Sequence, residues 1–129
     1  MDLTDITRIA ASGLRAQSLR MRIVAENLAN SDSVAATPGG SPYRRKLVEF
    51  KPTEDGVSVS GVSSDKSPFP RIYQPGHPAA DAQGYVLQPN VNGLVEAADM
   101  RAAQRSYEAN LNTIEAARSM TARTLDLLK

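Results

Sequence analysis

The chain has 129 residues, enough for one domain, and its fifteen Lys and Arg residues nearly balance its fourteen Asp and Glu residues. A net charge of +1 gives no long-range field that would attract nucleic acid or a membrane surface. The absence of cysteine excludes disulfides, thiolate metal sites and a cysteine nucleophile. Because 18 of the apolar residues are alanines, which bury little area each, we expect a monomer that is marginally stable without partners.

Proline placement divides the chain into three segments. All eight prolines lie between Pro38 and Pro89, so both ends are free of helix breakers. We therefore predict a helical segment at 1–30, a loop and small β-rich insert at 31–91, and a second helical segment at 92–129. Neither an uncharged apolar stretch of signal-peptide length nor a run of about 18 apolar residues occurs, so we expect no cleaved export signal and no membrane insertion.

The first segment has the pattern of one long helix with Asp2 as its N-cap. Apolar residues recur at seven-residue spacing in two rows, and a further apolar stripe lies on a neighbouring face. The rows are Leu3, Ala10, Gln17 and Val24, with Leu14, Met21 and Leu28; the stripe is Ile6, Ile9, Gly13 and Ala16. A helix with two apolar stripes can contact two partners.

The last segment predicts a longer helix with Asn92 as its N-cap. One row comprises Met100, Tyr107, Ile114, Thr121 and Leu128, and the companion row comprises Ala97, Gln104, Leu111, Arg118 and Leu125. Such a helix would be about 55 Å long, too long for the remaining residues to cover. We therefore expect a mainly α fold: two long terminal helices packed as an antiparallel coiled-coil-like pair that carries a small β-rich knob containing a hairpin.

The middle segment contains short extended stretches separated by turn residues. The strand candidates are 43–50, 56–62, 69–73 and 85–88, with a five-residue hairpin loop at 52–56. Residues 31–41 are small, polar and rich in Gly and Pro, which predicts a mobile or partner-ordered loop.

No constellation of residues points to catalysis, a cofactor or a metal. The single histidine, His77, stands between prolines and is far better explained as a turn residue than as a base or metal ligand, although Asp81 could pair with it. The triplet Arg44-Arg45-Lys46 lacks the wider basic surface that phosphate binding needs. A solvated strand face or an ion-pair site between subunits is the favoured interpretation of that triplet.

Several motifs resemble the rod and hook proteins of the bacterial flagellum. Ala11-Ser12-Gly13-Leu14 followed by Asn27-Leu28-Ala29-Asn30 resembles their N-terminal signature, and Ser106-Tyr107-Glu108-Ala109-Asn110 their C-terminal one. The middle motifs are similar to the proximal rod type in particular: Pro42-Tyr43-Arg44-Arg45-Lys46, Pro75-Gly76-His77-Pro78, and Gly84-Tyr85-Val86 leading to Pro89-Asn90-Val91-Asn92.

The resemblance implies a structural, non-enzymatic subunit of the flagellar basal-body rod, the hollow drive shaft that transmits torque from motor to hook. It implies export by the flagellar type III apparatus into the periplasm. The implied partners are copies of itself, other proximal and distal rod subunits, and the adaptor at the rod base. The motif residues that carry this expectation are Asn27, Asn30, Tyr43, Gly76, His77, Pro78, Gly84, Tyr85, Pro89, Asn90 and Asn110.

The apolar rows predict the assembly interface. Its expected residues are Leu3, Ile6, Ala10, Gly13, Leu14, Met21, Val24, Leu28, Met100, Tyr107, Leu111, Ile114, Leu125 and Leu128. Two alternative functions also fit the sequence. One is a cytoplasmic regulatory or chaperone-like module that holds a partner helix on the same stripes, and the other is an enzyme that uses His77 and Asp81.

Overall fold

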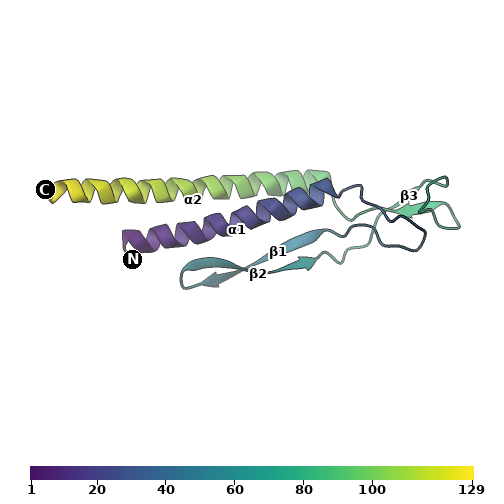
Figure 1. The fold of residues 1–129 in the computed structure, drawn as a ribbon, viewed down its shortest axis with the longest axis horizontal. Helices are drawn as coiled ribbons and strands as arrows, with labels where there is room; N and C mark the ends of the chain where they lie inside the picture. Colours follow the sequence, from purple (N-terminus) through teal and green to yellow (C-terminus); the bar gives the residue numbers. More distant parts are fainter.

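The structure, a computed structural model, describes residues 1–129 and is elongated, with two long helices side by side (Figure 1). The elements in chain order are α1 (Leu3–Ala29), β1 (Lys46–Thr53), β2 (Gly56–Ser64), β3 (Arg71–Tyr73), β4 (Tyr85–Leu87) and α2 (Gly93–Leu127). The predicted fold class is confirmed: the terminal helices pack against each other, and a small β insert lies between them in the sequence. Neither helix contains the long, uncharged apolar stretch that crossing a membrane requires.

Both helices begin at the predicted caps. Asp2 and Asp5 form a capping box, in which the Asp5 backbone N–H donates to Asp2 Oδ1 at 2.8 Å and the Asp2 N–H to Asp5 Oδ2 at 3.2 Å. The side chain of Asn92 accepts from the first free N–H groups of α2. At the end of α1, Asn30 Nδ2 donates to the Glu26 carbonyl at 2.9 Å, which satisfies a terminal carbonyl.

The helices run antiparallel, and their register is set by close contacts between small and polar residues. Gly13 of α1 faces Asn110 of α2 so closely that a Cβ at Gly13 would lie 2.6 Å from Asn110 Nδ2. Arg20 pairs with Asp99 nearer the insert end of the two helices. Gly13, on the second apolar stripe of the first helix, belongs to the contact between α1 and α2, because close approach requires a residue without a side chain there.

The row of α2 that meets α1 differs from one of the two predicted rows. Met100, Tyr107 and Ile114 are half-buried as expected for a seam. The predicted companion row, Ala97 to Leu125, is exposed. The row in its place is Glu96, Ala103, Asn110 and Ala117, of which three are buried and Asn110 is half-buried. The prediction missed it because a charged and an amide side chain interrupt its apolar character.

The hairpin β1–β2 lies along α1, so α1 is sandwiched between α2 and the hairpin (Figure 1). β1 lies three residues later than predicted and β2 is two residues longer. Thr53 pairs with Gly56, so only two residues connect the strands instead of a five-residue loop. Gly56 has φ +119, and its missing Cβ lets the turn approach Ile9 and Ser12 of α1. The Val57 N–H donates to Ser12 Oγ at 3.1 Å. The insert is therefore a third layer along α1 and not only a knob.

A second small sheet extends the molecule beyond the insert end of the helices (Figure 1). In it β3 pairs antiparallel with β4, with Ile72 opposite Val86. These strands are shorter than the stretches predicted at 69–73 and 85–88. Val86 is 1% exposed and is the main apolar anchor of this end of the molecule.

Candidate functional site

A network of buried and half-buried polar side chains joins α1, β1 and α2 near the end of α1; we name it the Asn27 junction (Asn27, Tyr43, Arg45, Lys46, Glu96). Asn27 is 1% exposed and uses both ends of its amide. Its Oδ1 accepts from the Tyr43 hydroxyl at 2.8 Å and the Lys46 N–H at 2.9 Å. Its Nδ2 donates to the Lys46 carbonyl at 2.9 Å and to Glu96 Oε2 at 3.3 Å.

Glu96, in the first turn of α2, is fully buried and ion-paired. Its Oε1 accepts a hydrogen bond from Arg45 Nε, and Arg45 Nη1 also lies 3.3 Å from Asp65 Oδ2. Burial acts to lower the pKa of Arg45, but the hydrogen bond and charge of Glu96 outweigh it and raise that pKa. A buried carboxylate needs such partners, because removing water from an unpaired charge is strongly unfavourable.

Asn90 and Arg44 extend the junction toward β2. The Oδ1 atom of Asn90 accepts from the Arg45 N–H at 2.7 Å, and its Nδ2 donates to the Asp65 carbonyl at 3.0 Å. Arg44 Nη1 donates to the same carbonyl at 2.7 Å, and its guanidinium lies 4.1 Å from the centroid of the Phe69 ring. These contacts hold the segment that precedes α2 against the segment that precedes β1.

The basic triplet is engaged within the chain itself, which neither of the interpretations favoured from the sequence includes. Arg45 is bound by Glu96, Lys46 Nζ lies 2.5 Å from Glu26 Oε1, and Arg44 is bound by backbone carbonyls. The hydrogen bond from Lys46 to Glu26 raises the pKa of Lys46. An asparagine near the end of a helix is expected to satisfy terminal carbonyls or to adopt left-handed geometry. Asn27 instead bridges three segments, because its side chain points into the junction.

The His77 and Asp81 side chains shape turns in the second sheet. His77 Nδ1 accepts from the Ala79 N–H at 3.0 Å. Asp81 Oδ1 accepts from the backbone N–H groups of Gln83 and Tyr85 at 3.0 and 2.9 Å. The Tyr85 hydrogen bond is the main reason that the pKa of Asp81 lies below its usual range. The geometry agrees with the interpretation of His77 as a turn residue.

The family-motif residues thus gather in three places. Asn27, Tyr43 and Asn90 meet at the junction, with the buried Pro89 beside Asn90 in the chain. Asn110 lies against Gly13, and Asn30 closes α1. The others, Gly76, His77, Pro78, Gly84 and Tyr85, lie around the second sheet. There Gly84, at φ +87, leaves room for the ring of Tyr73, which packs edge-on against Tyr85 at 5.3 Å between centroids.

The predicted interface residues divide by exposure. Ala10, Gly13 and Val24 are buried within the chain. The half-buried ones are Leu3, Ile6, Leu14, Met21, Leu28, Met100, Tyr107 and Ile114, and the exposed ones are Leu111, Leu125 and Leu128. The exposed and half-buried residues remain available to neighbouring subunits, whereas the buried ones stabilise the pairing of α1 with α2 and the hairpin.

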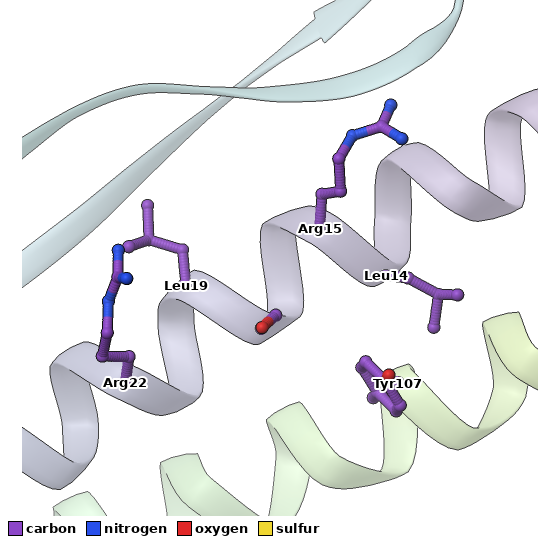
Figure 2. Close-up of a pocket in the computed structure, with 6 residues that line it drawn as sticks. Leu14, Arg15, Leu19, Arg22 and Tyr107 are labelled. Carbon is purple, nitrogen blue, oxygen red and sulfur yellow. The ribbon is translucent and has the colours of Figure 1, made fainter.

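A shallow groove of about 440 Å³ lies where α1 passes Tyr107 of α2 (Figure 2). Leu14, Leu19 and Tyr107 supply its apolar lining, and Arg15 and Arg22 supply two cations. Figure 2 shows Arg15, Leu19 and Arg22 projecting from successive turns of α1, with Leu14 nearer Tyr107. Neither arginine takes part in an ion pair within the chain. Sequence reasoning did not single out this groove, although Arg15 and Arg22 are seven residues apart.

An elongated body with paired terminal helices, a polar junction and exposed leucines defines a subunit suited to helical assembly. Two family profiles match the chain: one described as flagella basal body rod protein covers residues 8–36, and one described as flagellar basal body rod FlgEFG protein C-terminal covers residues 82–127. The class of protein is therefore that of the flagellar basal-body rod proteins.

Curated relatives match over nearly the whole chain. The flagellar basal-body rod protein FlgC of Agrobacterium fabrum is 50% identical over 98% of this chain and 96% of its own length. The FlgC proteins of Salmonella typhimurium and Borreliella burgdorferi are 43% and 36% identical, over 98% and 100% of this chain and 98% and 99% of their own lengths. The chain belongs to the FlgC family of flagellar basal-body rod proteins, and its role is that of a structural rod subunit.

The buried ion pairs are the functional feature that sequence reasoning missed. The sequence explains Glu96 and Asp99 only as favourable charges near the positive end of a helix. One signal was present: Glu96 stands one seven-residue step before Ala103, on the row that also contains Asn110 and Ala117. A carboxylate on a seam row predicts a buried partner.

Proposed function

We propose that this chain assembles with copies of itself and with other proximal and distal rod subunits into the hollow shaft that carries torque from motor to hook. The shaft surrounds the path of exported subunits and stands in the periplasm. The chain reaches that place through the flagellar type III export apparatus, and its rod-base neighbour is the export-gate adaptor. The division into axial helices at 1–30 and 92–129 and an insert at 31–91 is part of this proposal.

The observation that carries the proposal is the bracing of two long helices by directional contacts. Arg20 with Asp99, and Asn27 with Glu96, link α1 to α2 at positions that are seven residues apart on α1 and three residues apart on α2. Hydrogen bonds and ion pairs with fixed partners resist sliding of one helix along the other better than an apolar seam does, because they fix the register. A subunit under torsional load needs that resistance.

The role is non-enzymatic in this proposal. His77 and Asp81 are engaged by backbone N–H groups, and the ion-paired residues of the Asn27 junction hold segments together. The residues of the Asn27 junction have a structural role, because both carboxylate oxygens of the buried Glu96 accept hydrogen bonds from side chains of the chain itself.

The proposal is tested in a flagellated strain that lacks its own copy of this protein and expresses the chain with an epitope tag. We expect the tag in detergent-extracted hook–basal bodies and restored swimming. Recovery only as a soluble cytoplasmic oligomer would instead favour a helix-binding regulatory module and would contradict the proposal.

Two surface-facing variants sharpen the same test. Leu14→Asp and Ile114→Asp should block rod assembly and swimming while export of the chain continues, because each places a charge on a half-buried apolar position. Asn112→Asp, on the exposed side of α2, is the matched control and should swim normally. Normal swimming of both apolar-site variants would refute the predicted interface.

A further inference from the structure

The two arginines of the groove form a charged edge along α1. Arg15 and Arg22 are seven residues apart, so they lie on nearly the same face of the helix. Both are exposed, and neither takes part in an ion pair within the chain. Figure 2 shows both side chains pointing away from α2. Ser18 lines the groove between them, and its small side chain leaves room for a larger one. We name Arg15, Ser18 and Arg22 the arginine edge.

A second edge, of opposite charge, runs along α2. Glu108 and Glu115 are also seven residues apart, both are exposed, and neither takes part in an ion pair within the chain. Leu111, which is 39% exposed, stands three residues after the first and four before the second, so it lies on the same side of the helix. We name these three residues the glutamate edge. The chain therefore carries two unpaired edges with equal spacing and opposite charge.

The two edges do not meet within one chain. Because Gly13 faces Asn110 in the antiparallel pair, Arg15 and Glu108 lie at the same height along the helices. They form no ion pair even so, because Arg15 points away from α2 (Figure 2). Either edge can therefore gain an ion-paired partner only from another molecule. The opposite edge of a second copy has both the charge and the spacing that this partner needs.

The charges also select the height at which the second copy lies. With two copies side by side at equal height, Arg22 of one copy would lie opposite Arg101 of the second copy, and like charges in contact are unfavourable. A shift by one seven-residue step, about 10 Å along the helices, removes this repulsion. It places Arg15 opposite Glu115 of the second copy, and Arg22 opposite Glu108 of the second copy.

Large side chains meet small ones after the same shift. The row of α2 that contains Leu111 faces a row of small residues on α1, and both rows repeat every seven residues. The pairs are Leu111 with Ser18, Gln104 with Ala25, and Arg118 with Ala11. Leu111 of the second copy thereby enters the groove, where Leu14 and Leu19 offer it apolar contact.

The one additional cation in the contact is Arg118 of the second copy. After the shift it lies at a height between Arg8 and Arg15. The charge of Arg8 is balanced within its own chain by Asp5 and Asp55. The charge of Arg15 is balanced by the glutamate of the second copy, so Arg118 does not reverse the charge match.

We propose that the arginine edge of one copy packs against the glutamate edge of a second copy, which is shifted along the helices by about 10 Å. The contact joins two different surfaces of the chain, so it is not closed by a two-fold axis and repeats from copy to copy. A sideways contact with a constant shift generates a helical arrangement of subunits. This contact rests on the proposed function, because only a growing assembly supplies the next copy.

Charge exchange tests the partner and the shift together. In the strain that lacks its own copy, Arg15→Glu should reduce incorporation into basal bodies at least several-fold. Adding Glu115→Arg in the same chain should restore incorporation, whereas adding Glu108→Arg should not, because Glu108 belongs opposite Arg22. Lys51→Glu, at an exposed cation of β1 that has no ion pair, is the control and should be incorporated normally.

The charge-exchange variants all lie at exposed positions, so the isolated chains should keep the urea midpoint of the unchanged chain. Equal incorporation of the Arg15→Glu chain and the unchanged chain overturns the contact. Restoration by Glu108→Arg instead of Glu115→Arg overturns the shift, because that result is expected for copies at equal height.

The natural absence of cysteine allows an independent test by disulfide cross-linking. Two differently tagged copies, Ser18→Cys and Leu111→Cys, are co-expressed in the same strain, and isolated basal bodies are oxidised. We expect a disulfide-linked dimer that contains both tags and disappears on reduction. Each cysteine copy expressed alone should give no dimer. The matched control pairs Ser18→Cys with Gln104→Cys, which lies one seven-residue step away on the same row and is the neighbour expected without the shift.

The outcomes separate this contact from the proposed function. Basal bodies that contain both copies without the mixed dimer, or with an equal or higher yield from the Gln104 control, overturn the contact and leave the rod assignment intact. Absence of the chain from basal bodies overturns both. A photo-reactive residue at position 111 that captures another rod protein instead of the groove of a second copy overturns the choice of partner.

Discussion

The side chain of Asn110 occupies the space that a side chain at Gly13 would need. A Cβ built on Gly13 lies 2.6 Å from Asn110 Nδ2 and 2.9 Å from its Cγ, while the same Nδ2 donates to the Ser106 carbonyl at 2.9 Å. The two helices therefore approach closely at this point, where one contributes a glycine and the other an amide folded back on its own helix.

Gly13→Ala should destabilise the chain although alanine is the better helix former. The added methyl group must displace the amide of Asn110, and overpacking of this kind costs about 1–3 kcal/mol. Urea unfolding followed by circular dichroism measures the change. Adding Asn110→Ala should recover most of the loss, which makes the pair a double-mutant cycle.

Gly93→Ala is the matched control, since Gly93 begins α2 and nothing lies within 4 Å of its added Cβ. It should be neutral or stabilising by up to about 1 kcal/mol. If Gly13→Ala behaved like Gly93→Ala, the close approach of the helices would not exist in solution.

Glu96→Ala should be among the most destabilising single changes in the chain. It leaves the half-buried Arg45 with only Asp65, and removing one partner of an ion pair costs about 3–5 kcal/mol where both partners are fully buried. The expected loss is at the lower end of that range, because Arg45 is 18% exposed and keeps a second partner. Glu108→Ala, on the exposed side of α2, should change the urea midpoint little.

Stability should fall on acidification below the usual range of aspartate. The backbone N–H of Ser67 first, then its side chain and Arg45, hold the pKa of Asp65 below the usual aspartate value of 3.8. A carboxyl whose pKa is lower in the folded chain stabilises that chain above the unfolded pKa and loses this contribution as pH falls through the folded pKa. The loss should therefore begin at about pH 4, the unfolded pKa of aspartate, and continue below it.

Urea midpoints between about pH 2 and pH 6, a range that spans the aspartate titration, test this dependence. Asp65→Asn should be less stable than the unchanged chain at the upper end of the range and should show a shallower decline toward the lower end. Glu54→Gln, at the hairpin turn, is the control and should keep the original slope. An Asp65→Asn profile parallel to that of the unchanged chain would exclude Asp65 as a contributor.

Gly56→Ala should detach the hairpin turn from α1. Gly56 has φ +119, and its Cβ would collide with Ser12 Oγ and lie 3.2 Å from the Ile9 carbonyl oxygen. Strain at such a backbone position costs about 1–3 kcal/mol. Hydrogen exchange of the Val57 amide, which donates to Ser12, should accelerate, whereas Gly61→Ala in open space on the same strand should leave it unchanged.

The helices and their caps could be predicted from the sequence because their signals are local. Asp2 and Asn92 stand directly before apolar periodic segments, and prolines bound the middle. The position of the hairpin could not be predicted in the same way. Nothing within residues 46–64 indicates that Gly56 meets Ile9 and Ser12, since the fit depends on a missing side chain at a distant point.

The Asn27 junction was predicted least well, for a related physical reason. Arg45 and Glu96 are 51 positions apart in the sequence, and each has the composition expected of a solvent-exposed residue. The resemblance drew attention to Asn27, Tyr43 and Asn90 as motif residues, but only the fold shows that they meet. Polar residues that are buried in pairs carry no periodic signal, because their partners lie on other elements.

Protection from hydrogen exchange should be graded along α2 in the isolated chain. The buried positions of α2 lie between residues 96 and 117, while residues 122–128 have no partner within the chain and their leucines are largely exposed. We expect slow exchange in α1 and in 96–117, fast exchange in 122–128, and protection of residues 122–128 only in assembled rods. A marginally stable monomer is expected to have poorly ordered ends, and the structure limits this expectation to the end of α2, because α1 is covered by two elements and the end of α2 by none. Slow, uniform exchange through residue 128 in the monomer would contradict both the graded protection and the dependence of residues 122–128 on a partner.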